Sequence, residues 1–91
     1  MSIRSTVFLQ IQEIARENGV EPPALIDELP LMDSGLDSLA LAVLVARLEE
    51  VLGLDPFTEA DDFPDVVTLG DLVRFYEKSA SARDVAARHV T

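Results

Sequence analysis

The sequence predicts an all-α fold, an antiparallel four-helix bundle with a long loop between its first two helices and a short third helix. Three observations predict it. Apolar residues recur at steps of three and four along separate segments, glycine and proline fall between those segments, and apolar–polar alternation never lasts long enough for a strand. The 91 residues, 48% of them hydrophobic, suffice for one core and are too few for two.

The first helix is expected over residues 3–18. Its apolar positions share one helical stripe: Ile3, Val7, Phe8, Ile11, Ile14 and Ala15. Asn18-Gly19 favours a left-handed end to this helix. Pro22-Pro23 then prevents an early restart, because proline lacks an amide donor and restricts the residue before it.

Residues 20–37 form an unusually long connection. It is too apolar for a disordered linker, so we expect a loop pinned onto the core by Leu25, Ile26, Leu29, Leu31 and Leu36. Pro30 and Gly35 should set its turns. A short helical turn is expected over residues 24–28, directly after the double proline.

The second helix should run from Ser38 to Leu52, with Asp37 as its N-cap and Gly53 at its end. Its spacing predicts a core-facing stripe of Leu41, Leu44, Val45, Leu48, Val51 and Leu52. The opposite face then carries Ala40, Val43, Arg47 and Glu50. The first half of that face is unusually apolar for a surface.

Two further helices are expected in the second half of the chain. A short one should begin near Thr58 and Asp61 and end before Phe63-Pro64, while Thr68 caps a last core helix over residues 69–79. Beyond it, Val85 and Val90 bury too little to hold a firm element. We therefore expect one domain over residues 1–79 and a tail over residues 80–91 that is either helical or frayed.

The composition limits what the protein can bind. Seventeen acidic and seven basic residues give a net charge of −10, which opposes binding to nucleic acid or to an anionic membrane. The sequence has no cysteine, which rules out disulfides and thiolate sites. It shows neither a bilayer-length apolar run nor a secretory signal, so we expect a cytoplasmic monomer.

Neither a hydrolase nor a metal protein is favoured. A nucleophilic Ser38 would need a base, and the single histidine, His89, lies in the expected tail. The flanking residues also depart from the G-x-S-x-G elbow. The acidic cluster Asp55, Glu59, Asp61, Asp62 and Asp65 lacks the ligand order of an EF-hand loop, so we expect no specific metal site.

The most informative segment, residues 33–40, reads D-S-G-L-D-S-L-A. It resembles the phosphopantetheine attachment motif of acyl carrier and peptidyl carrier proteins, in which Ser38 matches the modified serine. The order of the expected helices over residues 3–79 and the stretch LALAVLVARLEEVLG after the serine resemble the same family. The resemblance implies a non-catalytic carrier with a covalent 4′-phosphopantetheine arm, derived from coenzyme A, on Ser38. It also implies that Asp37 helps the transferase to position its metal and cofactor.

The physical chemistry of the segment agrees with an attached phosphodiester. Free amides and the positive end of the helix dipole favour an anion near Ser38. Gly35 lets the backbone turn without a side chain in the way, while Leu36 and Leu39 are expected to anchor the turn on either side of the serine. The hydroxyl should therefore point outward.

The resemblance further implies partners and a cargo site. The partners would be a phosphopantetheinyl transferase, an acyl- or aminoacyl-loading ligase, and downstream transferases or synthases. Expected docking residues are Ala40, Val43, Arg47, Glu50, Asp61 and Asp62, and an acyl cavity would lie beside Leu44, Val45, Leu48 and Val73.

Many fatty-acid-type carriers present acidic side chains where this chain has Ala40 and Val43, so an exposed apolar strip of Leu39, Ala40 and Val43 is expected to contact a dedicated partner. The acidic content favours acyl cargo in a specialised lipid or polyketide-type pathway. An aminoacyl or peptidyl carrier of a nonribosomal-type pathway remains open. So does an unmodified acidic interaction module in which Ser38 only begins a helix.

Overall fold

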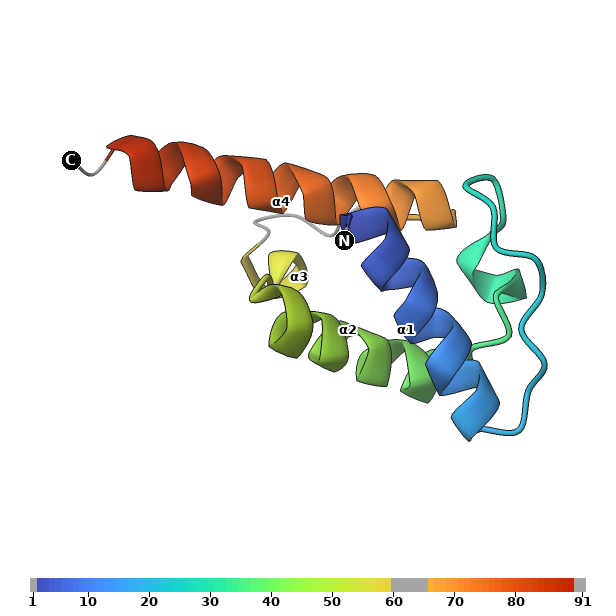
Figure 1. Ribbon diagram of the computed structural model, residues 1–91. Coiled ribbons are helices and arrows are strands. Elements are labelled where there is room, and N and C mark those ends of the chain that lie inside the picture. The colour runs from blue at the N-terminus through green and yellow to red at the C-terminus, as the bar shows by residue number, and fades with distance from the viewer. Residues whose placement is uncertain (1, 60–65, 90–91) are drawn as a thin grey trace.

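The computed structural model describes residues 2–59 and 66–89, without the side chains of residues 58–59 and 83–89. The order of elements along the chain is α1 (Ile3–Glu17), the 3-10 turn η1 (Leu31–Asp33), α2 (Ser38–Leu52), α3 (Pro56–Glu59) and α4 (Leu69–His89), as Figure 1 shows. The helical class is confirmed. In the described ranges the only strand-like feature is an isolated bridge between Pro30 and Thr68.

Helix α1 has the predicted position. Its N-cap, Ser2, accepts a hydrogen bond from the Ser5 amide at 3.1 Å. At the other end Gly19 has φ +74°, and the Val20 amide donates to the Ala15 carbonyl at 2.8 Å, which satisfies a carbonyl of the last turn. The helix therefore ends where the glycine allows a left-handed turn.

The connection from α1 to α2 differs from the prediction. Residues 24–28 form no helical turn: the chain turns at residues 27–28, and the 3-10 turn η1 follows at residues 31–33. The cause is a partner elsewhere in the chain, since the carbonyls of Asp27 and Leu29 accept hydrogen bonds from the amides of Gly70 and Leu69, each at 2.9 Å. The segment bonds to the start of α4 instead of to itself.

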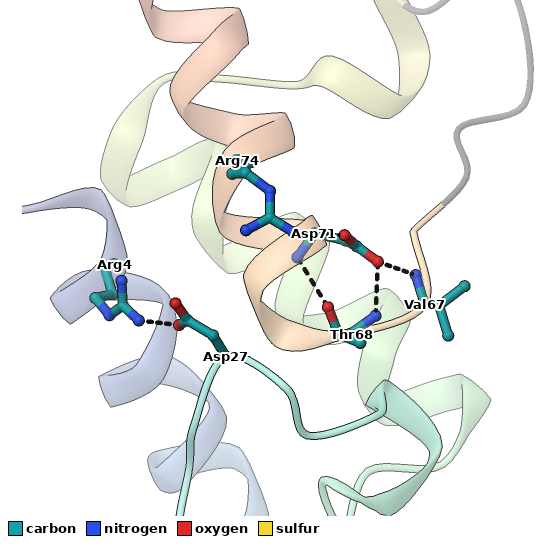
Figure 2. A network of polar contacts seen from close by, with 6 residues as sticks. All are labelled: Arg4, Asp27, Val67, Thr68, Asp71 and Arg74. Atoms are coloured by element: carbon teal, nitrogen blue, oxygen red, sulfur yellow. Dashed lines mark hydrogen bonds and ion pairs between the residues drawn. The ribbon is translucent and has the colours of Figure 1, made fainter.

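The start of α4 is held by side chains as well as by this loop (Figure 2). Thr68 accepts from the Asp71 amide at 3.1 Å, and the Asp71 carboxylate accepts from the amides of Val67 and Thr68, also at 3.1 Å. This is the reciprocal capping predicted for Thr68. Gly70 is required here because a β-carbon would lie 3.1 Å from the Asp27 β-carbon.

Helix α4 is longer than predicted. It continues through Ser79 to His89, so the expected end at Ser79 is wrong, and of the two alternatives for the tail the structure shows a helix. Residues 71–89 contain neither glycine nor proline, and a helix already under way propagates easily even where its apolar stripe has ended. Its last turns extend past the other helices (Figure 1). The proposed boundary at residue 79 stays a prediction.

The core lies between α1, α2 and α4. The buried apolar side chains that form it are Val7, Ile11, Ile14, Ala15, Leu36, Ala40, Leu44, Leu48, Leu54, Leu69, Leu72, Val73 and Tyr76. Helix α3 packs on α4 and begins at Pro56, earlier than predicted, because proline suits the first helical position. Residues 60–65, including the predicted end of this helix, lie outside the described residues. None of the described helices combines the length and apolar character needed to cross a bilayer.

Candidate functional site

Ser38 is the first residue of α2 and is exposed to solvent. The preceding residue, Asp37, accepts a hydrogen bond from the Ala40 amide at 2.8 Å through its side chain, and its carbonyl accepts from the Leu41 amide at 2.9 Å. The predicted N-cap is therefore confirmed. The cap fixes the first turn of α2, at whose start Ser38 is exposed to solvent.

The first two amides of α2 are free. Neither the Ser38 amide nor the Leu39 amide has a hydrogen-bond partner within the part of the chain that the structure describes. In α4, by contrast, the first three amides are all paired, with Leu29, Asp27 and Thr68. At the start of α2, unpaired donors and the positive end of a helix dipole thus meet an exposed serine, an arrangement that favours an attached anion.

The turn before Ser38 is built around Gly35 and Leu36. Gly35 has φ +90°, and a β-carbon there would lie 3.2 Å from Val20 Cγ1, so both the turn and the close approach need glycine. Leu36 is buried and anchors the turn as predicted. Ser34, which was not among the predicted site residues, is fully buried and donates a hydrogen bond from its hydroxyl to the Leu31 carbonyl at 2.6 Å.

Two expectations about the start of α2 are wrong. Leu39 is 74% exposed and does not anchor the turn, and Ala40 is only 3% exposed and belongs to the core. The buried stripe runs through Ala40, Leu44 and Leu48, which follow one another at steps of one turn. Val51, predicted to face the core, is 56% exposed for the same reason.

The outer face of α2 is apolar near Ser38 and polar further along. Its exposed residues are Leu39, Ala42, Val43, Ala46, Glu49, Glu50 and Val51. Arg47 is half-buried, and its guanidinium binds both oxygens of Glu17 on α1, at 2.9 and 2.5 Å. These hydrogen bonds hold the pKa of Glu17 below its ordinary value and raise the pKa of Arg47. The positive charge predicted to face a partner is therefore paired within the protein.

An apolar cavity of about 240 Å³ lies between α2, α3, α4 and the 3-10 turn η1. It is lined by Leu31, Leu41, Leu44, Val45, Phe57, Val66 and Leu72. Of the four residues expected beside a cavity, Leu44 and Val45 line this one. Leu48 and Val73 pack in the core and are not part of its wall. For the other five lining residues the sequence shows only that each is apolar. This does not reveal that they lie around one cavity.

Some expected site residues cannot be placed. Asp61 and Asp62 lie outside the described residues, and the side chain of His89 is likewise not described. Among the described side chains, no group of three or more histidine, cysteine or acidic residues is arranged to hold a metal ion.

An exposed serine at a helix start, beside unpaired amides and after a glycine turn, is the arrangement of a carrier domain with a covalently attached arm. The sequence profile of the family described as "Phosphopantetheine attachment site" matches residues 11–76, more than half of the chain. The chain therefore belongs to this family of phosphopantetheine-carrying proteins. Domains of the family bear a covalent 4′-phosphopantetheine group and catalyse no reaction, so the chain is a carrier and not an enzyme.

Similar proteins include two fungal enzymes and one bacterial carrier. The chain is 41% identical over 59 residues to the non-reducing polyketide synthase VdtA of Byssochlamys spectabilis and 37% identical over 60 residues to the non-reducing polyketide synthase aoiG of Aspergillus oryzae. Each alignment covers 65% of this chain but only 2% and 3%, respectively, of those synthases, so the chain spans a small part of their length.

The bacterial relative is a solved structure. MacpD, an acyl carrier protein from Pseudomonas fluorescens that is involved in mupirocin biosynthesis, superimposes with a TM-score of 0.73 at 32% identity. That alignment covers 97% of this chain and 85% of MacpD. The helical carrier fold is therefore matched over almost the whole chain.

Proposed function

We propose that Ser38 carries the 4′-phosphopantetheine arm and that the chain presents an acyl group, held as a thioester, to enzymes of a polyketide-type pathway. The observation that carries this proposal is the exposed Ser38 hydroxyl at the start of α2, beside the unpaired amides of Ser38 and Leu39. The antiparallel four-helix arrangement expected from the sequence is part of the same proposal.

The residues around Ser38 fit a phosphodiester. The two free amides can donate to its oxygens, while Asp37 is engaged with the Ala40 amide and keeps the first turn in place. Gly35 lets the chain turn close to Val20 directly before the serine. When bound, the arm would supply a terminal thiol, a group that the chain itself lacks because it has no cysteine.

Acyl cargo is favoured over aminoacyl cargo by two observations. The described residues that line the cavity beside α2 all have apolar side chains, which suit a hydrocarbon chain and offer nothing to an ammonium group. The similar proteins are two polyketide synthases and an acyl carrier protein, although the chain spans only a small part of the synthases. The pathway in which the chain works is a proposal on this basis.

The proposed partner surface is the exposed apolar strip Leu39, Ala42, Val43 and Ala46 on α2, beside Ser38. We propose that a phosphopantetheinyl transferase, a loading enzyme and downstream synthases approach this strip through apolar contacts. Arg47 adds no free charge, since it is paired with Glu17. The proposed acidic contacts with these partners are Glu50, Asp61 and Asp62. The proposed location of the protein is the cytoplasm.

The test is intact-mass spectrometry after coexpression with a broad-specificity phosphopantetheinyl transferase. We expect the mass to rise by one arm, and we expect the rise to vanish in Ser38→Ala. Ser81→Ala, which changes an exposed serine on α4, is the matched control and should be modified like the unaltered protein. No gain of mass in the unaltered protein would instead support an unmodified interaction module.

A further inference from the structure

The hydroxyl of Tyr76 on α4 is a buried polar group. The side chain is fully buried, and among the residues that the structure describes its oxygen has no hydrogen-bond partner. An unpaired buried hydroxyl destabilises a fold, because it loses its bonds to water and gains none. A phenylalanine would fill the same space without this cost, so the oxygen needs an explanation.

Tyr76 packs behind the residues that line the apolar cavity. On α4 it follows Leu72, a lining residue, by one turn. Phe57 lines the cavity as well, and its ring packs edge-on against the Tyr76 ring with the centroids 6.2 Å apart. Tyr76 is therefore not a lining residue itself but contacts the cavity wall through Phe57.

The hydroxyl lies toward the carboxyl end of α2. Burial, together with the negative charges of Asp55 and Glu49, raises the pKa of Tyr76 to about 12, so the group stays protonated and is a donor at neutral pH. Glu49 follows the lining residue Val45 by one turn of α2, as Tyr76 follows Leu72 on α4. Glu49 and Tyr76 therefore each lie one turn past a lining residue, on α2 and α4 respectively.

Neither carboxylate satisfies the hydroxyl, since no hydrogen bond joins them to it. The described residues that line the cavity have apolar side chains, so none of these side chains is an acceptor. A ligand that enters the cavity and displaces the edge of the Phe57 ring would bring one. Phe57 belongs to α3, a helix of four residues, where a side-chain rotation disturbs little regular structure.

We infer that Tyr76 is a polar anchor at the far end of the cavity and donates a hydrogen bond to an oxygen in the body of the carried acyl chain. The inference rests on the proposed function, because the chain enters from the arm on Ser38. Leu41 and Glu49 are two helical turns apart, about 12 Å along the axis of α2. The acyl-chain oxygen that accepts the hydrogen bond from Tyr76 therefore lies far from the thioester. The carrier thereby favours partly oxygenated chains over saturated chains of equal length.

The experiment compares two cargoes on the holo-protein. Undecanoyl and an undecanoyl chain with a ketone on its next-to-last carbon are each loaded on Ser38 from the corresponding coenzyme A thioester, and intact mass verifies loading. Thermal unfolding is then recorded for the unaltered protein and for Tyr76→Phe. We expect the ketone to raise the melting temperature by on the order of 4 °C more than undecanoyl does, and this difference to vanish in Tyr76→Phe.

Each outcome has one meaning. An equal effect of the two cargoes in the unaltered protein, or a ketone effect that survives in Tyr76→Phe, would overturn the inference. So would an unloaded Tyr76→Phe that melts well below the unaltered protein, because the hydroxyl would then have a partner in the unloaded state. A protein that gains no arm at all would contradict the proposed function instead, and the mass measurement shows this before any melting curve is recorded.

Discussion

Arg47 in the middle of α2 donates two hydrogen bonds, at 2.9 and 2.5 Å, to the carboxylate of Glu17 at the end of α1. The pair joins the helix that begins with Ser38 to the helix that precedes the long loop. It also removes a positive charge from the face that the proposed partners approach. In the free protein the charge of Arg47 therefore serves to link α1 and α2.

Because the pair is solvent-exposed, its contribution should depend on salt. We expect Glu17→Gln to lower the melting temperature slightly at low ionic strength and hardly at all in concentrated salt, where exposed charges are screened. Glu28→Gln, at an exposed position in the loop, is the control and should show no such salt dependence. A loss that is equal at low and high salt would show that the pair does not act through its charges.

The conformation of Gly35 leads to a second prediction. Gly35→Ala should destabilise the fold by more than Gly19→Ala, although both glycines have a positive φ. A left-handed alanine costs about 1–2 kcal/mol at either site. Only at residue 35 does the new β-carbon also meet a neighbour, Val20 Cγ1 at 3.2 Å, whereas nothing lies within 4 Å at residue 19.

Urea denaturation measures the difference between the two variants. Adding Val20→Ala to Gly35→Ala removes the crowding, so the double variant should lose only about as much as Gly19→Ala plus Val20→Ala. If the two single glycine variants lose equal stability, the contact with Val20 does not constrain the turn.

The sequence predicts the capped helix ends better than the helix faces, although the predicted end of α4 at Ser79 is wrong. Asp37, Gly53 and Thr68 act as the sequence predicts, because capping depends on a few neighbouring atoms. The face of α2 was misjudged at Ala40, since every residue from Leu39 to Ala46 is apolar and no polar residue marks the outer side. Contacts with the other helices decide the rotation of such a segment.

The candidate site shows the same division. Ser38 and Gly35 stand in a continuous motif, so the helix start at Ser38 and the turn at Gly35 could be predicted from local chemistry. The cavity is assembled from the 3-10 turn and three helices, with Leu31 and Leu72 far apart in the sequence. Tyr76 was expected in the last core helix, but only the packed structure shows that its hydroxyl is unpaired. Features that depend on long-range packing could not be predicted from spacing.

The capping carboxylate of Asp71 leads to a prediction about pH. Hydrogen bonds from the amides of Thr68 and Val67, together with one from Arg74, lower the pKa of Asp71 from 3.8 to about 2. A depressed pKa means that the ionised group stabilises the fold above its unfolded value and loses this effect as the pH falls through the folded value. Asp71→Asn should therefore be less stable than the unaltered protein at neutral pH, and the gap should close between about pH 4 and about pH 2.

Urea midpoints recorded across this range test the expectation. Asp33→Asn serves as the control, because this exposed carboxylate caps no helix and makes no ion pair with the residues that the structure describes. A stability gap for Asp71→Asn that stays constant down to about pH 2 would mean that the carboxylate's charge plays no part in the cap.

The last prediction separates the two roles considered for Asp37. Its cap on the Ala40 amide is seen in the structure, whereas help to the transferase is implied by the family resemblance alone. Asp37→Ala should cost about 1 kcal/mol of stability, while Asp37→Asn should keep the cap and lose the charge. If Asp37 only caps, Asp37→Asn will be modified on Ser38 as fast as the unaltered protein.

If Asp37 also positions the metal and cofactor of the transferase, Asp37→Asn will fold normally but gain its arm slowly. The measurement is the rate of arm transfer by mass spectrometry, beside the urea midpoint of each variant. We expect the second result, because a neutral amide can accept the Ala40 hydrogen bond but binds a metal ion far more weakly than a carboxylate. Equal transfer rates for Asp37→Asn and the unaltered protein would restrict Asp37 to its structural role.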